Sequence, residues 1–390
     1  MRLFISAGEP SGDEHAAHLL REMKLRDSDL SCDGFGGPEM REQGCRLLYE
    51  MTQNAVMGVV DVIPLLAQFR RLVKKAEAHL TEHPPDAVVL VDFPGFNWWI
   101  ARAAHRRGIP VYYYLPPQLW AWAPWRIRRV HKWVDHVICA LPFEHGWYKR
   151  HGVNATWVGH PFFDEVAEQQ LHGKTLSKLE SLGQDRQVFA LLPGSRSQEI
   201  ERNWPTMLQV VARVQQTQPA IKWIVGCHRE EHWRRCVELQ NDSGLQLDIH
   251  YETGRTSEVI EMSDACLMVS GSVSLELLAR RTPGIVLYRT GRILNFVGRR
   301  ALNTRFITLT NLIADDEIMP EFLSSGDPSG DIDRMAELLV LWARNRKTLS
   351  ARRQQMDELA AEVAITGATV RTAELLLGHQ ADRQSDHIAA

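Results

Sequence analysis

Residues 2–13 read RLFISAGEPSGD, an apolar run, Arg2–Ala7, followed at once by a turn of small and acidic residues, Gly8–Asp13. A helical pattern through Leu19, Leu20 and Met23 comes next. A strand that passes through such a turn into a helix is the repeating unit of parallel α/β layers. The same alternation continues along the whole chain, so the sequence predicts an α/β protein.

The predicted strands form two sets, separated by the polar segment 165–186, which lacks a strand pattern. We therefore expect two Rossmann-like, doubly wound domains, 1–164 and 187–348, joined by a linker and facing a central cleft. A helix over 349–378 is expected to pack on either domain, before a polar tail, 379–390. The predicted strands are 2–7, 30–35, 87–91, 111–114, 136–139 and 155–158, then 188–192, 222–225, 247–250, 265–269 and 285–287.

The composition is that of a folded protein. Its 390 residues are 44% hydrophobic and 24% charged, and the net charge of -3 gives no general attraction to nucleic acid. The six cysteines contain no CxxC pair, which indicates neither a disulfide framework nor a zinc ribbon. The sequence shows neither a signal peptide nor an apolar run of about 18 residues, so we expect a cytoplasmic protein with at most peripheral membrane contact.

Three carboxylates of the first domain are candidate catalytic groups. Asp92 follows the apolar run 87–91, at the sheet edge where a general base belongs. Its alternative role is to cap the helix that begins near Asn97. Glu9 and Asp13 lie in the first turn, which either binds a ligand or is only a tight turn with Ser11 as the helix cap.

Two turns of the second domain are suited to a nucleotide diphosphate. The run 188–192 ends in a turn that contains Gly194, Ser195 and Arg196, whose guanidinium can pair with phosphate. The run 265–269 ends in Gly271 and Ser272, and Glu276 follows, placed to accept bonds from ribose hydroxyls.

The sequence predicts neither a metal nor a cofactor. No DxD motif is evident. His228, His232 and Cys236 would align on one helix face, but a fourth ligand is not apparent and the surrounding charges fit a solvated helix.

An apolar stretch near residue 60 is a candidate landing surface on a membrane. Several basic side chains adjoin it, a composition that suits an interfacial helix, although an ordinary core helix would show the same stripe. The residues assigned to this surface are Val59, Val60, Ile63, Leu65, Phe69 and Leu72.

The segment Trp120–Trp133 mixes tryptophan with arginine, histidine and lysine. This favours a lipid or sugar-phosphate surface, and single-stranded nucleic acid is the alternative. Because the chain lacks the signature of a nucleic-acid module, we expect no nucleic-acid partner.

Taken in order, these motifs resemble the lipid-A-disaccharide synthases, inverting glycosyltransferases of the GT-B fold. The resemblance covers nearly the whole chain. The matching motifs are 8–13, 36–38, 55–58, 92–97, 120–122, 141–144, 159–161, 192–196, 270–271 with Glu276, 288–289 and 320–321. The chain departs from the family pattern at Pro10, 272–274, Asn303 and 308–311, where the family's usual Ser-Leu-Pro-Asn reads Thr-Leu-Thr-Asn.

The resemblance implies transfer of 2,3-diacylglucosamine from its UDP-linked donor to 2,3-diacylglucosamine 1-phosphate, with a β(1→6) linkage and release of UDP. It implies that Asp92 and Glu9 match the first-domain active site. Arg196, Glu276 and Asn311 would match the UDP side, together with Arg289. The implied location is the inner face of the inner membrane, and a homodimer is left open.

Two other functions are compatible with the residues. One is another GT-B-type enzyme that uses a UDP-sugar, such as an epimerase or a transferase with a different acceptor. The other is a membrane-associated binding protein that has kept the fold and lost the chemistry.

Overall fold

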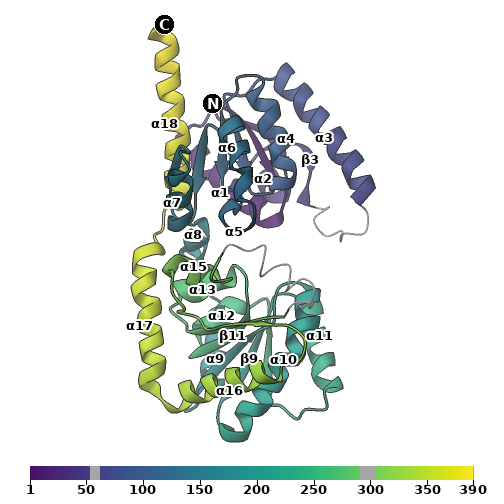
Figure 1. The fold of residues 1–390 in the computed structure, drawn as a ribbon, viewed down its shortest axis with the longest axis vertical. Helices are drawn as coiled ribbons and strands as arrows, with labels where there is room; N and C mark the ends of the chain where they lie inside the picture. The colour runs from purple at the N-terminus through teal and green to yellow at the C-terminus, as the bar shows by residue number, and fades with distance from the viewer. Residues whose placement is uncertain (53–61, 290–303, 390) are drawn as a thin grey trace. The chain divides into compact units, whose positions relative to one another are not determined.

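The structure, a computed structural model, describes residues 1–52, 62–289 and 304–389 (Figure 1). The chain forms two compact units, one made of Met1–Asp164 with Thr366–Ala390 and the other of Glu165–Ile365. Each unit is built around one parallel sheet. The predicted fold class, α/β with two Rossmann-like doubly wound domains, is confirmed.

The first unit contains a seven-stranded sheet in the order β3-β2-β1-β4-β5-β6-β7. The chain enters at β1 in the middle, winds to one edge and then returns to build the other side from β4. Such a reversal leaves the ends of β1 and β4 adjacent, which is where open α/β sheets bind ligands. The strands are β1 Arg2–Ala7, β2 Ser31–Gly36, β3 Arg46–Glu50, β4 Ala87–Val91, β5 Val111–Tyr114, β6 His136–Cys139 and β7 Ala155–Trp157.

Alternate side chains of these strands supply two hydrophobic cores. Phe4, Val88 and Leu90 point to the face covered by α3, α4, α6 and α7. Leu3 and Ile5 point to the opposite face, covered by α1 and α18. The helices are α1 Pro10–Arg26, α2 Pro38–Glu42, α3 Val62–Glu82, α4 Pro94–His105, α5 Leu119–Trp122, α6 Ile127–Trp133, α7 Pro142–Arg150, α8 Pro161–Glu168 and α18 Ala368–Ala389, with a 3₁₀ turn, η2, at Pro124–Arg126.

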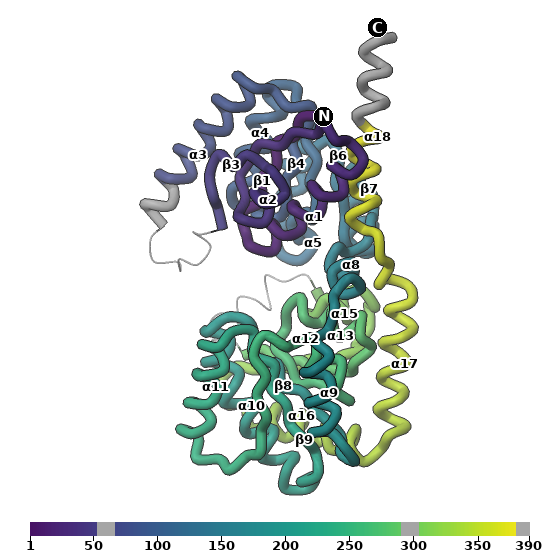
Figure 2. Tube along the Cα trace, turned by 180° about the vertical axis from the view of Figure 1, so that it is seen from behind, coloured from purple at the N-terminus to yellow at the C-terminus, as the bar shows by residue number. Residues whose placement is uncertain are grey.

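The end of the chain differs from the single helix expected over 349–378. Two helices are present, α17 Arg346–Val363 and α18 Ala368–Ala389, and α18 lies against α1 of the first unit (Figure 2). The break between them is fixed by the Asp164 carboxylate, which accepts bonds from the backbone N–H groups of Gly367, Ala368 and Thr369 at 2.6–3.3 Å. Residues 379–389, expected to be a polar tail, continue α18.

The second unit repeats the winding with six strands in the order β10-β9-β8-β11-β12-β13. Its switch point lies between β8 and β11, the strands that precede both predicted nucleotide turns. The strands are β8 Val188–Leu192, β9 Lys222–Cys227, β10 Ile249–Thr253, β11 Ala265–Val269, β12 Gly284–Arg289 and β13 Glu321–Ser324. The helices are α9 Gly173–Leu182, α10 Ser197–Thr217, α11 Glu230–Asp242, α12 Thr256–Glu261, α13 Val273–Ala279, α15 Leu309–Ala314, α16 Ser329–Arg344 and α17.

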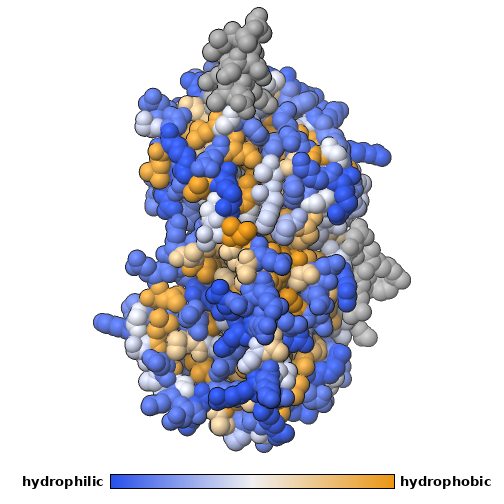
Figure 3. Space-filling model, turned by 90° about the vertical axis from the view of Figure 1, so that its left-hand side faces the viewer, coloured by the Kyte–Doolittle hydropathy of each residue, from blue (hydrophilic) through white to orange (hydrophobic). Residues whose placement is uncertain are grey.

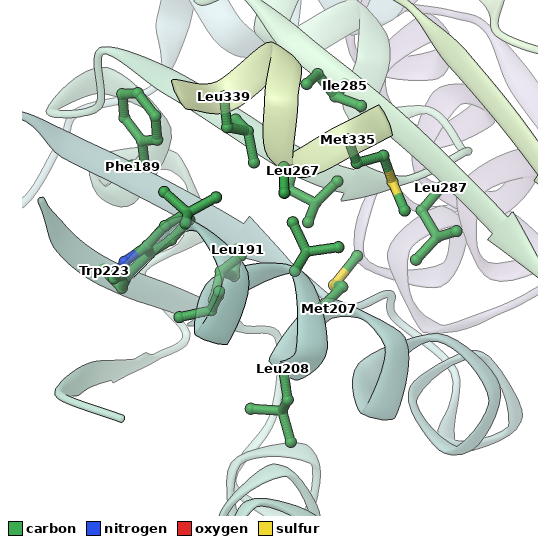
Figure 4. Close-up of a cluster of buried hydrophobic side chains, with 14 of the residues drawn as sticks. Phe189, Leu191, Met207, Leu208, Trp223, Leu267, Ile285, Leu287, Met335 and Leu339 are labelled. Atoms are coloured by element: carbon green, nitrogen blue, oxygen red, sulfur yellow. The ribbon is translucent and has the colours of Figure 1, made fainter. Parts of the chain in front are cut away.

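The core of the second unit lies between its sheet and the pair α10 and α16. Leu191, Leu267 and Leu287 from three neighbouring strands meet Met207 of α10 and Met335 of α16 (Figure 4). The segment 165–186, expected to be a linker, belongs to this unit because its helix α9 buries Leu179 and packs against α12.

Asp13 has a structural role that the sequence did not indicate. Its buried carboxylate accepts bonds from the backbone N–H groups of Gly37, Glu39 and Met40 at 2.7–3.2 Å and so caps α2. Both of its oxygens are thus bonded within the fold, and a catalytic role for Asp13 stays a prediction.

We predict that Asp13→Ala destabilises the protein by about 2–3 kcal/mol, because it leaves three backbone donors of α2 without an acceptor. Equilibrium urea unfolding measures the loss, and Glu42→Ala, which removes an exposed carboxylate of the same helix, is the matched control. A variant with wild-type stability and no turnover would return Asp13 to the chemistry.

Candidate active site

The candidate site of the first unit is built where β1 and β4 end side by side. Ala7 pairs with Val91, so the turns that follow these two residues are neighbours. Gly8 lies directly against Phe93, and a Cβ added at Gly8 would come within 2.1 Å of the Phe93 ring. Only glycine therefore permits the two turns to pack this closely.

The start of α1 excludes the role considered for Ser11. The helix begins at Pro10, with exposed Glu9 at its N-cap and no side-chain bond to the cap. Proline suits the first helical position because its φ is already helical and its missing N–H is not needed there. Pro10, a departure from the family pattern, thus fits its place, and the Glu9 carboxylate is left at the sheet edge.

Asp92 and Phe93 occupy a strained turn. Their φ angles are 43° and 47°, in the left-handed region that side chains rarely adopt. Each such residue costs about 1–3 kcal/mol and persists where its surroundings enforce it, commonly at functional sites. The first turn of α4 has Phe93 at its N-cap and no side-chain cap, so the Asp92 carboxyl does not serve as a helix cap.

Two buried side chains enforce this turn. The Asn97 amide donates to the carbonyl oxygens of Asp92 and Val91 at 2.8 and 3.2 Å, and it accepts a bond from the Ser6 hydroxyl at 2.7 Å. The Tyr113 hydroxyl donates to the Asp92 carbonyl at 2.8 Å. The main chain of Asp92 is therefore fixed, and its side chain has a defined starting direction.

The environment of Asp92 raises the pKa of its carboxyl to about 6. Burial is the largest cause, and the negative charge of Glu9 adds to it. A bond from the Phe93 N–H and the nearby His15 lower the pKa and limit the shift. A carboxylate with a pKa just below neutral pH is mostly ionised there, yet binds a proton better than an ordinary aspartate, as a general base requires.

Glu144, on α7, is a residue of this site to which the sequence gave no role. Its buried carboxyl accepts a bond from the Trp120 Nε1–H at 3.2 Å. Burial raises the pKa of Glu144 to about 8, and the charge of Asp92 contributes to the rise. The only signal in the sequence was its place in the 141–144 motif, because a glutamate in the first turn of a helix is ordinary.

The tryptophan-rich segment divides into buried and exposed members. Trp120 is buried, whereas Trp122 is 39% and Trp125 66% exposed. Trp99 of α4 is 51% exposed, and the Arg126 guanidinium lies over the Trp122 ring at 4.6 Å. Of the tryptophans of this segment, Trp122 and Trp125 are thus the ones exposed to a ligand or surface.

The candidate landing surface is only partly described. Val59 and Val60 lie outside the described residues, as do the side chains of Ile63 and Leu65 on α3. Leu72 is buried, and half-buried Phe69 packs against Phe93 and Phe96 with ring centroids 6.2 and 5.4 Å away. Leu72 therefore belongs to the core beneath α3, which corrects its assignment to the surface, whereas Phe69 packs against that core and is only partly buried.

The candidate site of the second unit begins at the turn after β8. Gly194 has a φ of 115°, and the Glu199 carboxylate accepts bonds from the N–H groups of Ser195 and Arg196 at 3.1 and 3.3 Å. The Arg196 side chain is 78% exposed and pairs with Glu199 at 3.0 Å. An exposed ion pair contributes about 0–1 kcal/mol, so Arg196 can exchange Glu199 for a phosphate at little cost.

The turn after β11 is open at its tip and closed at its base. Gly271 and Ser272 are exposed, and no atom lies within 4 Å of a Cβ added at Gly271. Glu276 of α13 is buried, and its carboxylate is bonded to the Arg280 guanidinium at 3.0 Å. The turn therefore offers a free backbone next to a fixed carboxylate.

The departures from the family pattern in the second unit lie together. The hydroxyl of Thr310, at the usual proline position, donates to the Ser274 carbonyl at 2.9 Å, and the Ser274 hydroxyl donates to the Gly271 carbonyl at 2.9 Å. These residues connect α15 to the turn after β11. Asn303, the other departure noted, lies outside the described residues.

Asn311 and Arg289 are occupied within the second unit. The buried Asn311 amide bonds to both backbone groups of Met319 and to the Glu321 carboxylate at 2.7–2.9 Å. The Arg289 guanidinium donates to the Thr206 hydroxyl and the Gly326 carbonyl at 2.8 and 2.7 Å. The Asn311 amide therefore holds the loop before β13, and its expected place on the UDP side stays a prediction.

Within residues 1–52, 62–289 and 304–389, no group of three or more His, Cys, Asp or Glu side chains could hold a metal ion. In the same part of the chain, no helix combines the length and apolar character needed to cross a membrane. On the face drawn in Figure 3, hydrophobic side chains alternate with hydrophilic ones over short distances.

The family model of lipid-A-disaccharide synthetase matches residues 3–370. The chain belongs to this family. A lipid-A-disaccharide synthase of Myxococcus xanthus is 33% identical over 377 residues, which covers 96% of this chain and 97% of the relative. The synthase of Geobacter sulfurreducens is 34% identical over 330 residues, 85% of each chain. The chain is therefore a glycosyltransferase of lipid A biosynthesis, and the alternative functions are not favoured.

Solved structures of other enzymes share the fold. A UDP-GlcNAc 2-epimerase of Neisseria meningitidis, bound to UDP-GlcNAc, has a TM-score of 0.65 and 13% identity, covering 97% of this chain and all of its own. An Escherichia coli trehalose-6-phosphate structure with UDP-2-fluoro glucose has a TM-score of 0.58 and 11% identity, covering 97% and 99%. At these identities the likeness establishes the GT-B architecture alone.

We predict that kcat/KM falls on the acid side with a midpoint near pH 6, because Asp92 must be ionised to accept a proton. Glu9→Gln should move this midpoint to lower pH, since the charge of Glu9 raises the pKa of Asp92. Glu42→Gln, on the surface of α2, should leave it unchanged. A pH profile of Glu9→Gln that overlays the wild type would contradict the assignment.

Proposed function

We propose that this enzyme joins UDP-2,3-diacylglucosamine to 2,3-diacylglucosamine 1-phosphate, forming the β(1→6) disaccharide 1-phosphate and UDP. Family membership supports the reaction type. The observation that carries the assignment of the chemistry is Asp92, a carboxylate in an enforced left-handed turn with its pKa raised to about 6.

In the proposed reaction, Asp92 takes the proton of the acceptor's 6-hydroxyl while that oxygen attacks the anomeric carbon of the donor. The new C–O bond forms on one face as the bond to the UDP oxygen breaks on the other, so the anomeric configuration inverts. The electron pair of the broken bond leaves with UDP. Glu9, on the adjacent turn, is the second candidate for the base.

The donor is proposed to bind the second unit. The backbone around Gly194 and Ser195 and the exposed Arg196 guanidinium would contact the diphosphate, together with the open turn Gly271–Ser272. Glu276 would accept bonds from the ribose hydroxyls. Arg289 would contribute indirectly, because its guanidinium donates to the Gly326 carbonyl and so holds the turn at Gly326.

The acceptor is proposed to be drawn from a lipid surface, the inner face of the inner membrane. The contact would involve Val59, Val60, Ile63 and Leu65, whose apolar side chains precede the basic part of α3. Trp122 and Trp125, exposed beside Arg126, have the aromatic and basic character of an interfacial surface.

The decisive experiment incubates the purified protein with both acylated substrates in the absence of added metal and measures disaccharide and UDP. We predict that Asp92→Asn lowers kcat by about 10²–10⁴-fold, because general-base catalysis is lost, and leaves UDP affinity nearly unchanged. Asparagine has nearly the same size as aspartate, so the variant should keep its fold. An unchanged melting temperature is the control. Near-wild-type kcat at saturating acceptor would exclude Asp92 as the base.

We predict that replacing Ile63 and Leu65 together by serine reduces binding to anionic vesicles while the melting temperature stays near wild type. Leu72→Ser on the same helix should instead lower the melting temperature, since it places a hydroxyl in the core without a partner. Vesicle flotation and a melting curve separate the two effects. A stable double variant that still floats with the vesicles would contradict the proposed contact.

A further inference from the structure

We propose that Arg280 is a positioning residue for the donor, which holds the carboxylate of Glu276 in the orientation that receives the ribose hydroxyls. The inference rests on the proposed placement of the donor. It adds a residue that acts through Glu276 and does not itself touch the substrate.

The contacts of Arg280 leave its guanidinium little freedom. Its side chain is only 7% exposed, and it donates from Nε to Glu276 at 3.0 Å. Nη1 donates to Glu261 at 2.9 Å and Nη2 to Gln169 at 2.7 Å. Gln169 is itself bonded to the Ser257 hydroxyl at 3.0 Å. All three nitrogens of the planar fork are thus engaged, each by a different segment of the second unit.

This arrangement fixes Glu276 from one side. A buried carboxylate needs a partner, and the Arg280 guanidinium supplies the charge and the direction. The contact engages Oε1, while a carboxylate has about four acceptor positions over its two oxygens. Acceptor capacity therefore remains for ribose hydroxyls, and the side chain does not have to be ordered when the nucleotide binds.

The position of Gln169 adds to the argument. Gln169 follows α8, the helix within which the chain passes from the first unit to the second. An exposed residue of this passage is thus connected to the predicted ribose contact through Arg280, whose side chain is 7% exposed. Nothing in the sequence singles out Arg280, since two arginines, Arg280 and Arg281, adjoin there and only the first is bonded to Glu276.

The test compares the binding of UDP and 2′,3′-dideoxy-UDP by calorimetric titration. Arg280→Gln should weaken UDP binding by about tenfold and leave the dideoxy ligand nearly unaffected, because only ribose hydroxyls sense the orientation of Glu276. Arg280→Lys should recover part of the loss. Arg213→Gln, which removes an exposed guanidinium paired with Asp333, is the control and should change neither affinity.

Gln169→Ala provides a second variant that keeps the Arg280–Glu276 pair and alters only an exposed residue. We expect about threefold weaker UDP binding, again without an effect on the dideoxy ligand. This variant tests the inference even where loss of the buried arginine prevents folding. Wild-type UDP affinity in Gln169→Ala, or equal losses for both ligands in either variant, would overturn the positioning role.

Glu276→Gln separates this inference from the proposed function on which it rests. If this variant loses discrimination between the two ligands while Arg280→Gln retains it, the ribose contact stands and the role of Arg280 is refuted. If Glu276→Gln discriminates like the wild type, the placement of the donor ribose fails and the inference fails with it.

Discussion

The candidate site of the first unit depends on the left-handed turn at Asp92 and Phe93. A strand that ended in an ordinary turn would point the side chain at residue 92 elsewhere, and the ring at residue 93 would not reach Gly8. The free energy that this turn costs is offset by buried hydrogen bonds from Asn97 and Tyr113 to the Asp92 carbonyl. The same burial raises the pKa of the Asp92 carboxyl, so one local constraint sets both the position and the proton affinity of the candidate base.

In the second unit, the turns are held by carboxylates that accept hydrogen bonds from backbone N–H groups. Glu321 accepts bonds from the N–H groups of Ile307 and Thr308 and from the Asn311 amide, at 2.8–2.9 Å. Glu199 does the same for the turn after β8. Carboxylates that accept bonds from several N–H donors order loops that have little hydrophobic core of their own. The open turns are thus held at their bases and free at their tips, as a diphosphate site requires.

Most of the fold could be predicted from the sequence because central parallel strands are apolar on both faces. The predicted limits of β1, β4, β5, β6, β8 and β11 agree with the structure. The edge strands β3 and β13 were missed, since each pairs on one side only and carries charged residues, such as Arg46 and Glu321. The roles of the site residues were harder to predict than the strands. Asp92 directly follows β4, whereas Asp13 lies on α1 and Asn311 on α15, and the pattern alone does not reveal whether such a polar side chain bonds to the backbone of the protein or faces a ligand.

The sequence pattern of α3 is ambiguous for the same reason. A stripe of apolar residues beside basic ones is equally typical of a core helix and of an interfacial one, because both must bury one face and hydrate the other. The buried part of α3 is committed to the core, where Phe69 contacts Phe93, the neighbour of Asp92, and Phe96 of α4. Any lipid contact of this helix therefore falls to its first turns. Phe69 therefore joins the packing of α3 to the ring that follows Asp92, so the core beneath this helix and the surroundings of the candidate base share one aromatic cluster.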